Sequence, residues 1–299
     1  MRRDRLDSAG LAMLLGVQLL LAFNQIVVKL VNAGLQPVFF AGLRSALAVA
    51  CLWLWLRLRG RPPRLRRAAF GQGLLIGAVF SAEFLFLFVA LDLTTVGRAS
   101  VIMYSMPVWF AILAHFGLGE RVTRNTALGL ALAFAGCAWA ILSRGPGEGG
   151  SLIGDLCALG AAWGWAGTAF VARRPVMRAE GPEMQLFWMV LVSTPILLLA
   201  APFLGPLIRD LQPIHLAGLV FQSAVVVCGG FISWLWLMSV YPSATVASFS
   251  FLTPVLSVLL GWALMGESLS LAILGAVGLV AAGIVLINRA PRRQVATDG

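Results

Sequence analysis

Glu83 is the only acidic residue deep within an apolar segment of this sequence, in the stretch FSAEFLFLFVALD. A carboxylate in such surroundings is costly, which makes it a functional candidate by default. The group could carry a proton, or it could meet the amino group of a ligand. A structural ion pair with Lys29 or Arg44, which lie at roughly similar depth, would also explain it.

A second polar pattern follows the first apolar segment, where Gln18, Ala22, Gln25, Lys29 and Asn32 recur at helical spacing. This spacing places them on one face of a helix. Polar side chains that face lipid are costly, so the stripe should face a cavity or a partner helix. Ligand binding and interhelical hydrogen bonding explain the pattern equally well.

Other candidate ligand-binding side chains are aromatic or mildly polar, and each lies within an apolar segment. Together with Gln18, Gln25 and Glu83 they form the predicted substrate-binding set: Phe80, Phe84, Tyr104, Trp163, Gln222 and Ser250. Trp163 adjoins a face of small residues (Gly160, Gly164 and Gly167), which suits either a pocket wall or a close helix contact. Trp165 is about 200° away around the helix and is expected to face elsewhere.

Residue patterns that support catalysis or metal binding do not occur in the sequence. The two histidines are far apart, and the four cysteines are dispersed within apolar runs. We find no HExxH, GxSxG or P-loop motif. The sequence therefore predicts no catalytic residue, no metal site, no cofactor and no enzymatic activity.

The elements that position these residues are expected to be transmembrane helices. The chain is 60% hydrophobic and 11% charged, and its apolar runs are long enough to cross a bilayer. We predict an all-α integral membrane fold of ten transmembrane helices, at 10–31, 37–57, 69–91, 98–118, 125–142, 152–172, 183–204, 215–238, 243–265 and 269–288. The opening run is too long for a signal peptide and is interpreted as the first of them.

The placement of basic residues supports this count. With the N-terminus in the cytoplasm, 17 of the 22 Lys and Arg residues fall on the cytoplasmic side and three, Arg98, Arg144 and Arg209, on the opposite side. The remaining two, Lys29 and Arg44, lie within helices. This asymmetry follows the positive-inside rule. It predicts cytoplasmic N- and C-termini, and it explains the net charge of +10 without nucleic-acid binding.

The two halves of the chain share a pattern at an offset of 147 residues. MPVWFAILAHFGLGERV begins at Met106, and TPVLSVLLGWALMGESL begins at Thr253. The proline, the Gly-Glu pair and a later Ala-Gly pair align without a gap. Each half holds an odd number of helices, so the second half must enter the membrane from the other side. The predicted units are 1–144 with helices 1–5 and 150–299 with helices 6–10 and a basic cytoplasmic tail.

The repeated motif also assigns structural roles. Pro107 and Pro254 remove backbone donors and should bend helices 4 and 9. These bends could be paired gating hinges, or static bends that accommodate packing. Glu120 and Glu267, at the starts of helices 5 and 10, are expected to complement the dipoles of those helices and to cap them.

Ten helices in two inverted five-helix halves, each ending in Pro…Gly-Glu and a glycine-bearing last helix, resemble the EamA-type drug/metabolite transporter superfamily. Within it, the aromatic-rich helices are most similar to bacterial exporters of aromatic amino acids. The resemblance covers essentially the whole chain. It implies a central cavity lined by helices 1, 3, 4, 6, 8 and 9, with helices 5 and 10 at the periphery.

The expected function is secondary export of small amphiphiles, foremost aromatic or other apolar amino acids, by alternating access through that cavity. Export of cationic drugs or other metabolites, and uncoupled facilitation or channel activity, are the alternatives. The expected partners are a small-molecule substrate and membrane lipid, without nucleic acid, and the expected state is a monomer or weak oligomer. The expected location is the bacterial cytoplasmic (inner) membrane.

Overall fold

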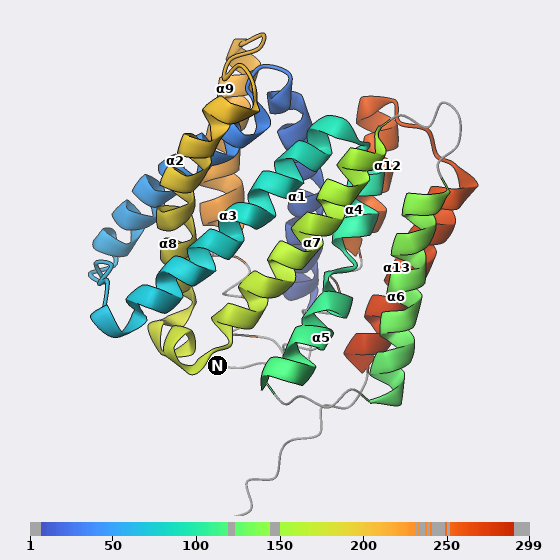
Figure 1. The fold of residues 1–299 in the computed structure, drawn as a ribbon, viewed down its shortest axis with the longest axis horizontal. Coiled ribbons are helices and arrows are strands. Elements are labelled where there is room, and N and C mark those ends of the chain that lie inside the picture. The colour runs from blue at the N-terminus through green and yellow to red at the C-terminus, as the bar shows by residue number, and fades with distance from the viewer. Residues whose placement is uncertain are drawn as a thin grey trace, which may run out of the picture.

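The chain folds into an array of helices, as the computed structural model in Figure 1 shows. The structure describes residues 7–118, 123–143, 150–230, 233, 237, 240, 249 and 252–289. The α-helices are α1 (Ser8–Asn32), α2 (Pro37–Leu58), α3 (Phe70–Leu93), α4 (Val96–Met103), α5 (Met106–Leu118), α6 (Arg124–Leu142), α7 (Leu152–Ala172), α8 (Pro175–Ala200), α9 (Pro213–Val220), α12 (Leu252–Met265) and α13 (Leu271–Arg289). Short 3-10 helices η1 (Arg67–Ala69) and η2 (Ala201–Leu204) flank α3 and α8, and a π-helix, η3 (Phe221–Gly230), continues α9.

The observed boundaries agree with the predicted segments to within a few residues over most of the described chain. One difference is the early start of α8 at Pro175, which is explained by a break at Gly181, where φ is 78°. Within the described residues, six helical stretches are long and apolar enough to cross a membrane. Large apolar side chains remain exposed on their outer faces, as at Leu58 (80% exposed) and Phe116 (83% exposed). Lipid covers such surfaces in a membrane protein, whereas water would leave a large unfavourable patch.

The predicted bend in helix 4 is a complete break between α4 and α5. Tyr104 ends α4, and the Ser105 N–H donates to the Ile102 carbonyl at 3.0 Å in a tighter turn. Pro107 lies in the first turn of α5, where its missing N–H costs no helical hydrogen bond. The Ser105 hydroxyl also accepts a hydrogen bond from Trp109 Nε1 at 3.1 Å. Pro254 lies likewise in the first turn of α12.

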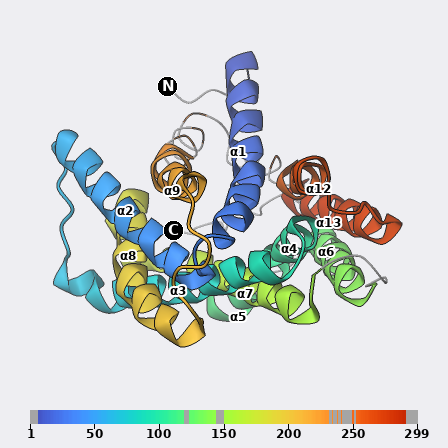
Figure 2. The same cartoon turned by 90° about the horizontal axis from the view of Figure 1, so that it is seen from above.

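The last helices of the two repeats, α6 and α13, lie side by side (Figures 1 and 2). Their closest approach is at two glycines that are 147 residues apart. A Cβ atom on Gly136 would lie 2.7 Å from the Ala276 carbonyl oxygen, and one on Gly283 would lie 2.5 Å from the Gly129 carbonyl oxygen. Because 129 and 276 are also 147 residues apart, the contact is reciprocal, as expected where a pseudo-two-fold axis passes between helices.

One side of the molecule is formed by α1, which lies between α9 and α12 (Figure 2). On the far side of the molecule from these helices, α3 packs against α7 and α8. Two glycines of the GLLIG stretch permit this approach, because Gly73 lies against the Trp188 ring and Gly77 against Val192.

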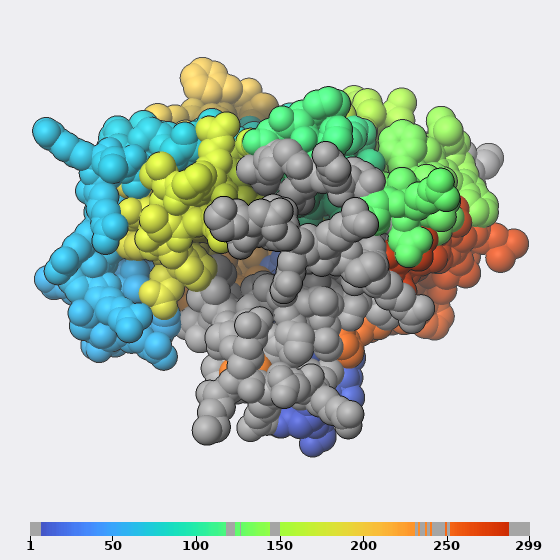
Figure 3. Space-filling view, turned by 90° about the horizontal axis from the view of Figure 1, so that it is seen from below, coloured from blue at the N-terminus to red at the C-terminus, as the bar shows by residue number. Residues whose placement is uncertain are grey.

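The connection that follows α2 and the start of α8 lie on the same face of the molecule (Figure 3). An ion pair joins them, with Arg66 Nε 3.8 Å from Glu180 Oε1. Arg57 and Arg59 lie over the rings of Trp53 and Trp55, each with 4.9 Å between guanidinium carbon and ring centroid. Arginines beside tryptophans are typical of the membrane–water interface.

Candidate functional site

The polar stripe of α1 forms hydrogen bonds to three other helices. The Thr253 hydroxyl of α12 donates to Gln18 Oε1 at 2.5 Å, and the Ser100 hydroxyl of α4 donates to Gln25 Oε1. Further along α1, Asn32 Nδ2 donates to the Phe88 carbonyl of α3 at 2.9 Å. The stripe therefore faces partner helices in this structure, and the part that its side chains play in ligand binding stays a prediction.

These contacts leave part of the hydrogen-bonding capacity of the interior unused. Several buried polar atoms lack a hydrogen-bond partner among the described residues: Gln18 Nε2, Asn24 Oδ1, Asn32 Oδ1, Gln222 Oε1, Ser257 Oγ, and Nε and Nη2 of Arg44. Each such group costs about 1–3 kcal/mol relative to a satisfied one. Unpaired polar atoms of this kind need an explanation, and the capacity to bind a polar ligand is one.

Glu83 lies between α3 and α7 and is 5% exposed. The Thr168 hydroxyl of α7 donates to Glu83 Oε2 at 3.0 Å. Gly164 makes this position possible, because a Cβ atom there would lie 2.7 Å from the Glu83 Cα. The small-residue face of α7 is thus a close helix contact. Within the described residues, Lys29 pairs with Glu267 and not with Glu83.

Aromatic rings extend along α3 beside this carboxylate. The ring centroids of Phe80 and Phe84 are 4.5 Å apart, and those of Phe84 and Phe88 are 5.9 Å apart. The guanidinium carbon of Arg44, from α2, lies 3.9 Å from the Phe84 centroid and 5.3 Å from that of Phe88. The Arg44 side chain therefore completes an interior cluster of two opposite charges and three phenylalanines.

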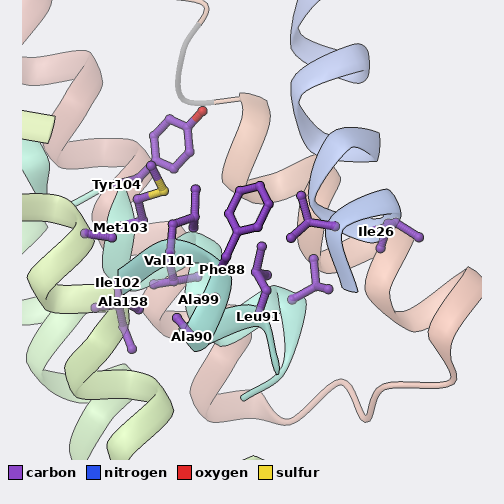
Figure 4. Packing of buried hydrophobic residues seen from close by; sticks show 14 of the residues in the cluster. Ile26, Phe88, Ala90, Leu91, Ala99, Val101, Ile102, Met103, Tyr104 and Ala158 are labelled. Carbon is purple, nitrogen blue, oxygen red and sulfur yellow. The ribbon is translucent and has the colours of Figure 1, made fainter. Parts of the chain in front are cut away.

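Tyr104 extends from the α4 break in the same direction as Phe88 (Figure 4). It is 7% exposed and packs edge-on against Trp165 of α7, with 5.5 Å between the ring centroids. Trp165 and Trp163 point to different neighbours, as their separation of about 200° around the helix predicts. Trp163 is 54% exposed, and its ring packs against that of Trp109 of α5 with 5.2 Å between the ring centroids. The role of Trp163 in ligand binding stays a prediction.

Gln222 lies in the π-helix that continues α9. Its side chain is fully buried, and its Nε2 donates to the Asn24 carbonyl of α1 at 3.0 Å. A π-helical turn is rare and often occurs at functional sites. Ser250, the remaining predicted site residue, lies outside the described residues.

Glu267 does not cap its own helix, which corrects the expectation for it. Its carboxylate caps α4 of the other repeat, accepting from the Val96 N–H at 2.7 Å and the Gly97 N–H at 3.1 Å, and it pairs with Lys29 at 3.1 Å. The start of α13 is capped by the Ser270 hydroxyl, which accepts from the Ile273 N–H at 3.2 Å. Glu120, the equivalent residue of the first repeat, lies outside the described residues.

The glycine of the Gly-Glu pair explains how the carboxylate reaches α4. Gly266 has φ of 66°, the left-handed conformation that ends a helix and redirects the chain. Gly261 leaves room for the carboxylate, since a Cβ atom there would lie 2.5 Å from Glu267 Oε2. In the second repeat the Gly-Glu motif is therefore a turn that places the Glu267 carboxylate at the start of α4 in the first repeat.

A buried ion pair between Arg98 and Asp155 was not predicted. Arg98 was expected at the outer end of the predicted helix 98–118, but it is 3% exposed in α4, and its Nη2 lies 2.7 Å from Asp155 Oδ2 of α7. Its Nη2 also donates to the Ala140 carbonyl, and the Thr94 hydroxyl donates to Asp155 Oδ1 at 2.7 Å. The only signal in the sequence was one charge of each sign near the ends of two helices.

A helical fold with exposed apolar faces, built from two repeats, is typical of a membrane transporter. Comparison with known proteins identifies the family. The EamA-like transporter family matches residues 8–142 and 152–289, so the chain belongs to this family. It is accordingly a multi-pass membrane transporter and not an enzyme.

Curated relatives cover most of the chain. An uncharacterized transporter of Bacillus subtilis (strain 168), YvbV, is 29% identical over 268 residues, which is 87% of this chain and 85% of that protein. A probable amino-acid metabolite efflux pump of Escherichia coli (strain K12) is 27% identical over 273 residues, 88% of this chain and 89% of that protein. A solved crystal structure shares the fold, with a TM-score of 0.65 and 20% identity over 94% of this chain and 97% of that chain.

Proposed function

We propose that the protein is a secondary exporter of small amphiphiles, foremost aromatic or other apolar amino acids, that works by alternating access between its two repeats. The observation that carries the proposal is the amphiphilic interior, where a wall of phenylalanines on α3 adjoins buried polar atoms without partners on α1 and α2. An amino acid with an apolar side chain offers matching apolar and polar parts. The probable amino-acid efflux pump of Escherichia coli, a relative along most of the chain, supports this substrate class.

In this proposal the substrate path is lined by Gln18, Gln25, Phe80, Glu83, Phe84, Tyr104, Trp163, Gln222 and Ser250. These side chains become accessible when the helices around α1 separate. Pro107 and Pro254 act as hinges. At Pro107 the helix is already interrupted and bends without losing a further hydrogen bond. The protein lies in the bacterial inner membrane with both termini in the cytoplasm, as a monomer or weak oligomer.

A second candidate function is the export of flat cationic drugs. The observation that favours it is the buried Glu83 carboxylate beside Phe80 and Phe84, because a cation can pair with the carboxylate and stack on the rings. Both functions can operate by facilitated exchange, or they can be coupled to protons through Glu83.

The deciding experiment is counterflow with purified protein in liposomes, using the twenty amino acids and several cationic dyes. We expect saturable exchange of phenylalanine and tryptophan above the rate of protein-free liposomes. Saturable exchange of dyes alone would favour the second candidate. Exchange of neither class above the protein-free rate would contradict both, and a rate that rises linearly with concentration would indicate a channel.

A further inference from the structure

Arg44 is a buried cation whose hydrogen-bonding groups are largely unused. The side chain lies in the second turn of α2 and is 3% exposed. Its Nε and Nη2 are buried without a hydrogen-bond partner among the described residues. This contrasts with Arg98, which is equally buried but bonds a carboxylate and a backbone carbonyl. Of these two buried arginines, Arg98 is satisfied, whereas Arg44 leaves two of its nitrogens without a partner in the described part of the chain.

Cation–π contact accounts for only part of the environment of Arg44. The Phe84 ring, 3.9 Å from the guanidinium carbon, stabilises the charge through one face of the planar group. The N–H groups point outward in the plane of the guanidinium, where a ring on its face cannot accept from them. A planar acceptor with two oxygens, such as a carboxylate, fits this fork of donors.

Glu83 supplies the opposite charge in the same cluster but does not use Arg44 as its partner. Glu83 directly precedes Phe84 in α3, and the Phe84 ring lies 3.9 Å from the Arg44 guanidinium carbon, so the two charged groups belong to one cluster. The Glu83 carboxylate is nevertheless held by Thr168 at 3.0 Å, and no ion pair joins it to Arg44 in the described part of the chain. The cluster therefore presents an anion-binding group and a cation-binding group that are separate from each other.

We propose that Arg44 binds the carboxylate of the transported molecule and Glu83 its ammonium group, so that the site selects zwitterionic amino acids over amines and over carboxylic acids. The aromatic or apolar side chain of the substrate lies against Phe80 and Phe84. This assignment rests on the proposed transport function and deepens it by naming the two groups that recognise the charges of the substrate. It also adds Arg44 to the binding residues.

The net charge of the site supports a zwitterion as the ligand. An isolated guanidinium would favour any organic anion, but the nearby Glu83 carboxylate repels a second negative charge. A molecule with both charges satisfies each group, and the ligand–protein ensemble remains neutral in a medium of low dielectric constant. A simple amine leaves Arg44 unpaired, and a simple acid leaves Glu83 without a cation.

The test compares three ligands that differ in one group each. They are L-phenylalanine, phenethylamine, which lacks the carboxylate, and 3-phenylpropionate, which lacks the ammonium group. Binding to the purified full-length protein in detergent is followed by the ligand-dependent rise in Tm. We expect the wild-type protein to bind phenylalanine at least about tenfold more tightly than either analogue.

Two substitutions separate the roles of the charges. Arg44→Gln is expected to weaken the binding of phenylalanine and 3-phenylpropionate about 10- to 100-fold, the range of a lost charge-assisted contact. The binding of phenethylamine should not change. Glu83→Gln is expected to weaken the binding of phenylalanine and phenethylamine and to leave the binding of 3-phenylpropionate unchanged. Arg57→Gln is the matched control, because Arg57 also lies in α2 over an aromatic ring, that of Trp53. It should leave all three affinities unchanged.

The outcomes distinguish this inference from the proposed function. Counterflow of neither amino acids nor dyes by wild-type protein would overturn the function and the inference with it. Counterflow of phenylalanine combined with equal affinity for phenethylamine would overturn the inference alone. The same holds if folded Arg44→Gln protein loses all three ligands equally. If Arg44→Gln does not fold, the wild-type comparison and Arg44→Lys decide, because Arg44→Lys should favour phenylalanine over phenethylamine less strongly than wild type.

Discussion

Glu267 caps the helix that begins at Val96 in the other repeat, with 2.7 Å between its Oε1 and the Val96 nitrogen. The same oxygen receives Lys29 Nζ from α1 at 3.1 Å. Three helices that are distant in the sequence thus meet at one carboxylate. In the second repeat the Gly-Glu pair therefore has a tertiary role, because its glutamate caps a helix of the first repeat.

We expect Glu267→Ala to destabilise the protein by about 1–3 kcal/mol, since it removes an N-cap and leaves Lys29 without its carboxylate partner. Thermal unfolding in detergent measures this as a lower Tm. The control is Asp92→Asn, which breaks a more exposed pair in which Arg209 Nη1 lies 2.7 Å from Asp92 Oδ1. An exposed pair contributes at most about 1 kcal/mol. Equal shifts in the two variants would contradict the capping role.

Breaking the buried Arg98–Asp155 pair is expected to destabilise the protein more than removing the Glu267 cap. Asp155→Ala leaves the Arg98 guanidinium buried without its carboxylate, which typically costs about 3–5 kcal/mol. We therefore expect a strong loss of folded protein, measured by size-exclusion chromatography and Tm. Replacing both residues with apolar ones, as in Arg98→Met with Asp155→Leu, should recover part of that stability. A double variant no more stable than Asp155→Ala would show that the buried charge is not the cause.

The contact between α6 and α13 can be tested with two glycines of the same helix. Gly283→Ala places a methyl group 2.5 Å from the Gly129 carbonyl oxygen and should force the helices apart. Gly278→Ala, one and a half turns earlier in α13, meets no atom within 4 Å. We expect Gly283→Ala to lower Tm, with a cost of about 1–3 kcal/mol from overpacking. Gly278→Ala should leave Tm unchanged or raise it, because alanine favours the helix by up to about 1 kcal/mol.

The proposed hinge at Pro107 predicts a kinetic effect. Pro107→Ala restores a backbone donor beside the break at Tyr104 and Ser105, which should favour a continuous helix 4 and slow the conformational change. We expect counterflow of phenylalanine at a maximal rate about tenfold lower, with an unchanged KM. A normal rate in a folded variant would indicate that the break is a static accommodation to packing.

Much of the fold could be predicted from local sequence features. Apolar length and the placement of arginines predicted the helices, and Pro107 predicted the interruption of helix 4, because these effects act within a few residues. The polar face of α1 was also predicted from spacing, since helical periodicity fixes which residues share a face.

The partners of individual side chains could not be predicted in the same way. Arg98 and Asp155 are 57 residues apart, and Glu267 is 171 residues from Val96. Their pairing depends on how whole helices are placed, which local spacing does not determine. Trp165 shows the same limit, because helical spacing predicts that it points away from Trp163 but does not predict its contact with Tyr104.

The reciprocal glycine contact between α6 and α13 has a consequence for any cycle in which the two repeats exchange conformations. In such an exchange each residue takes the place of its equivalent 147 positions away. The Gly136–Ala276 contact then becomes Gly283–Gly129, which already exists, so this pair of contacts is the same before and after. The Glu267–Val96 cap has no such invariance, because it maps onto positions 120 and 243. The glycine contacts between α6 and α13 can therefore stay in place throughout the exchange. The Glu267–Val96 cap, in contrast, would break on one side of the membrane while the equivalent contact forms on the other side.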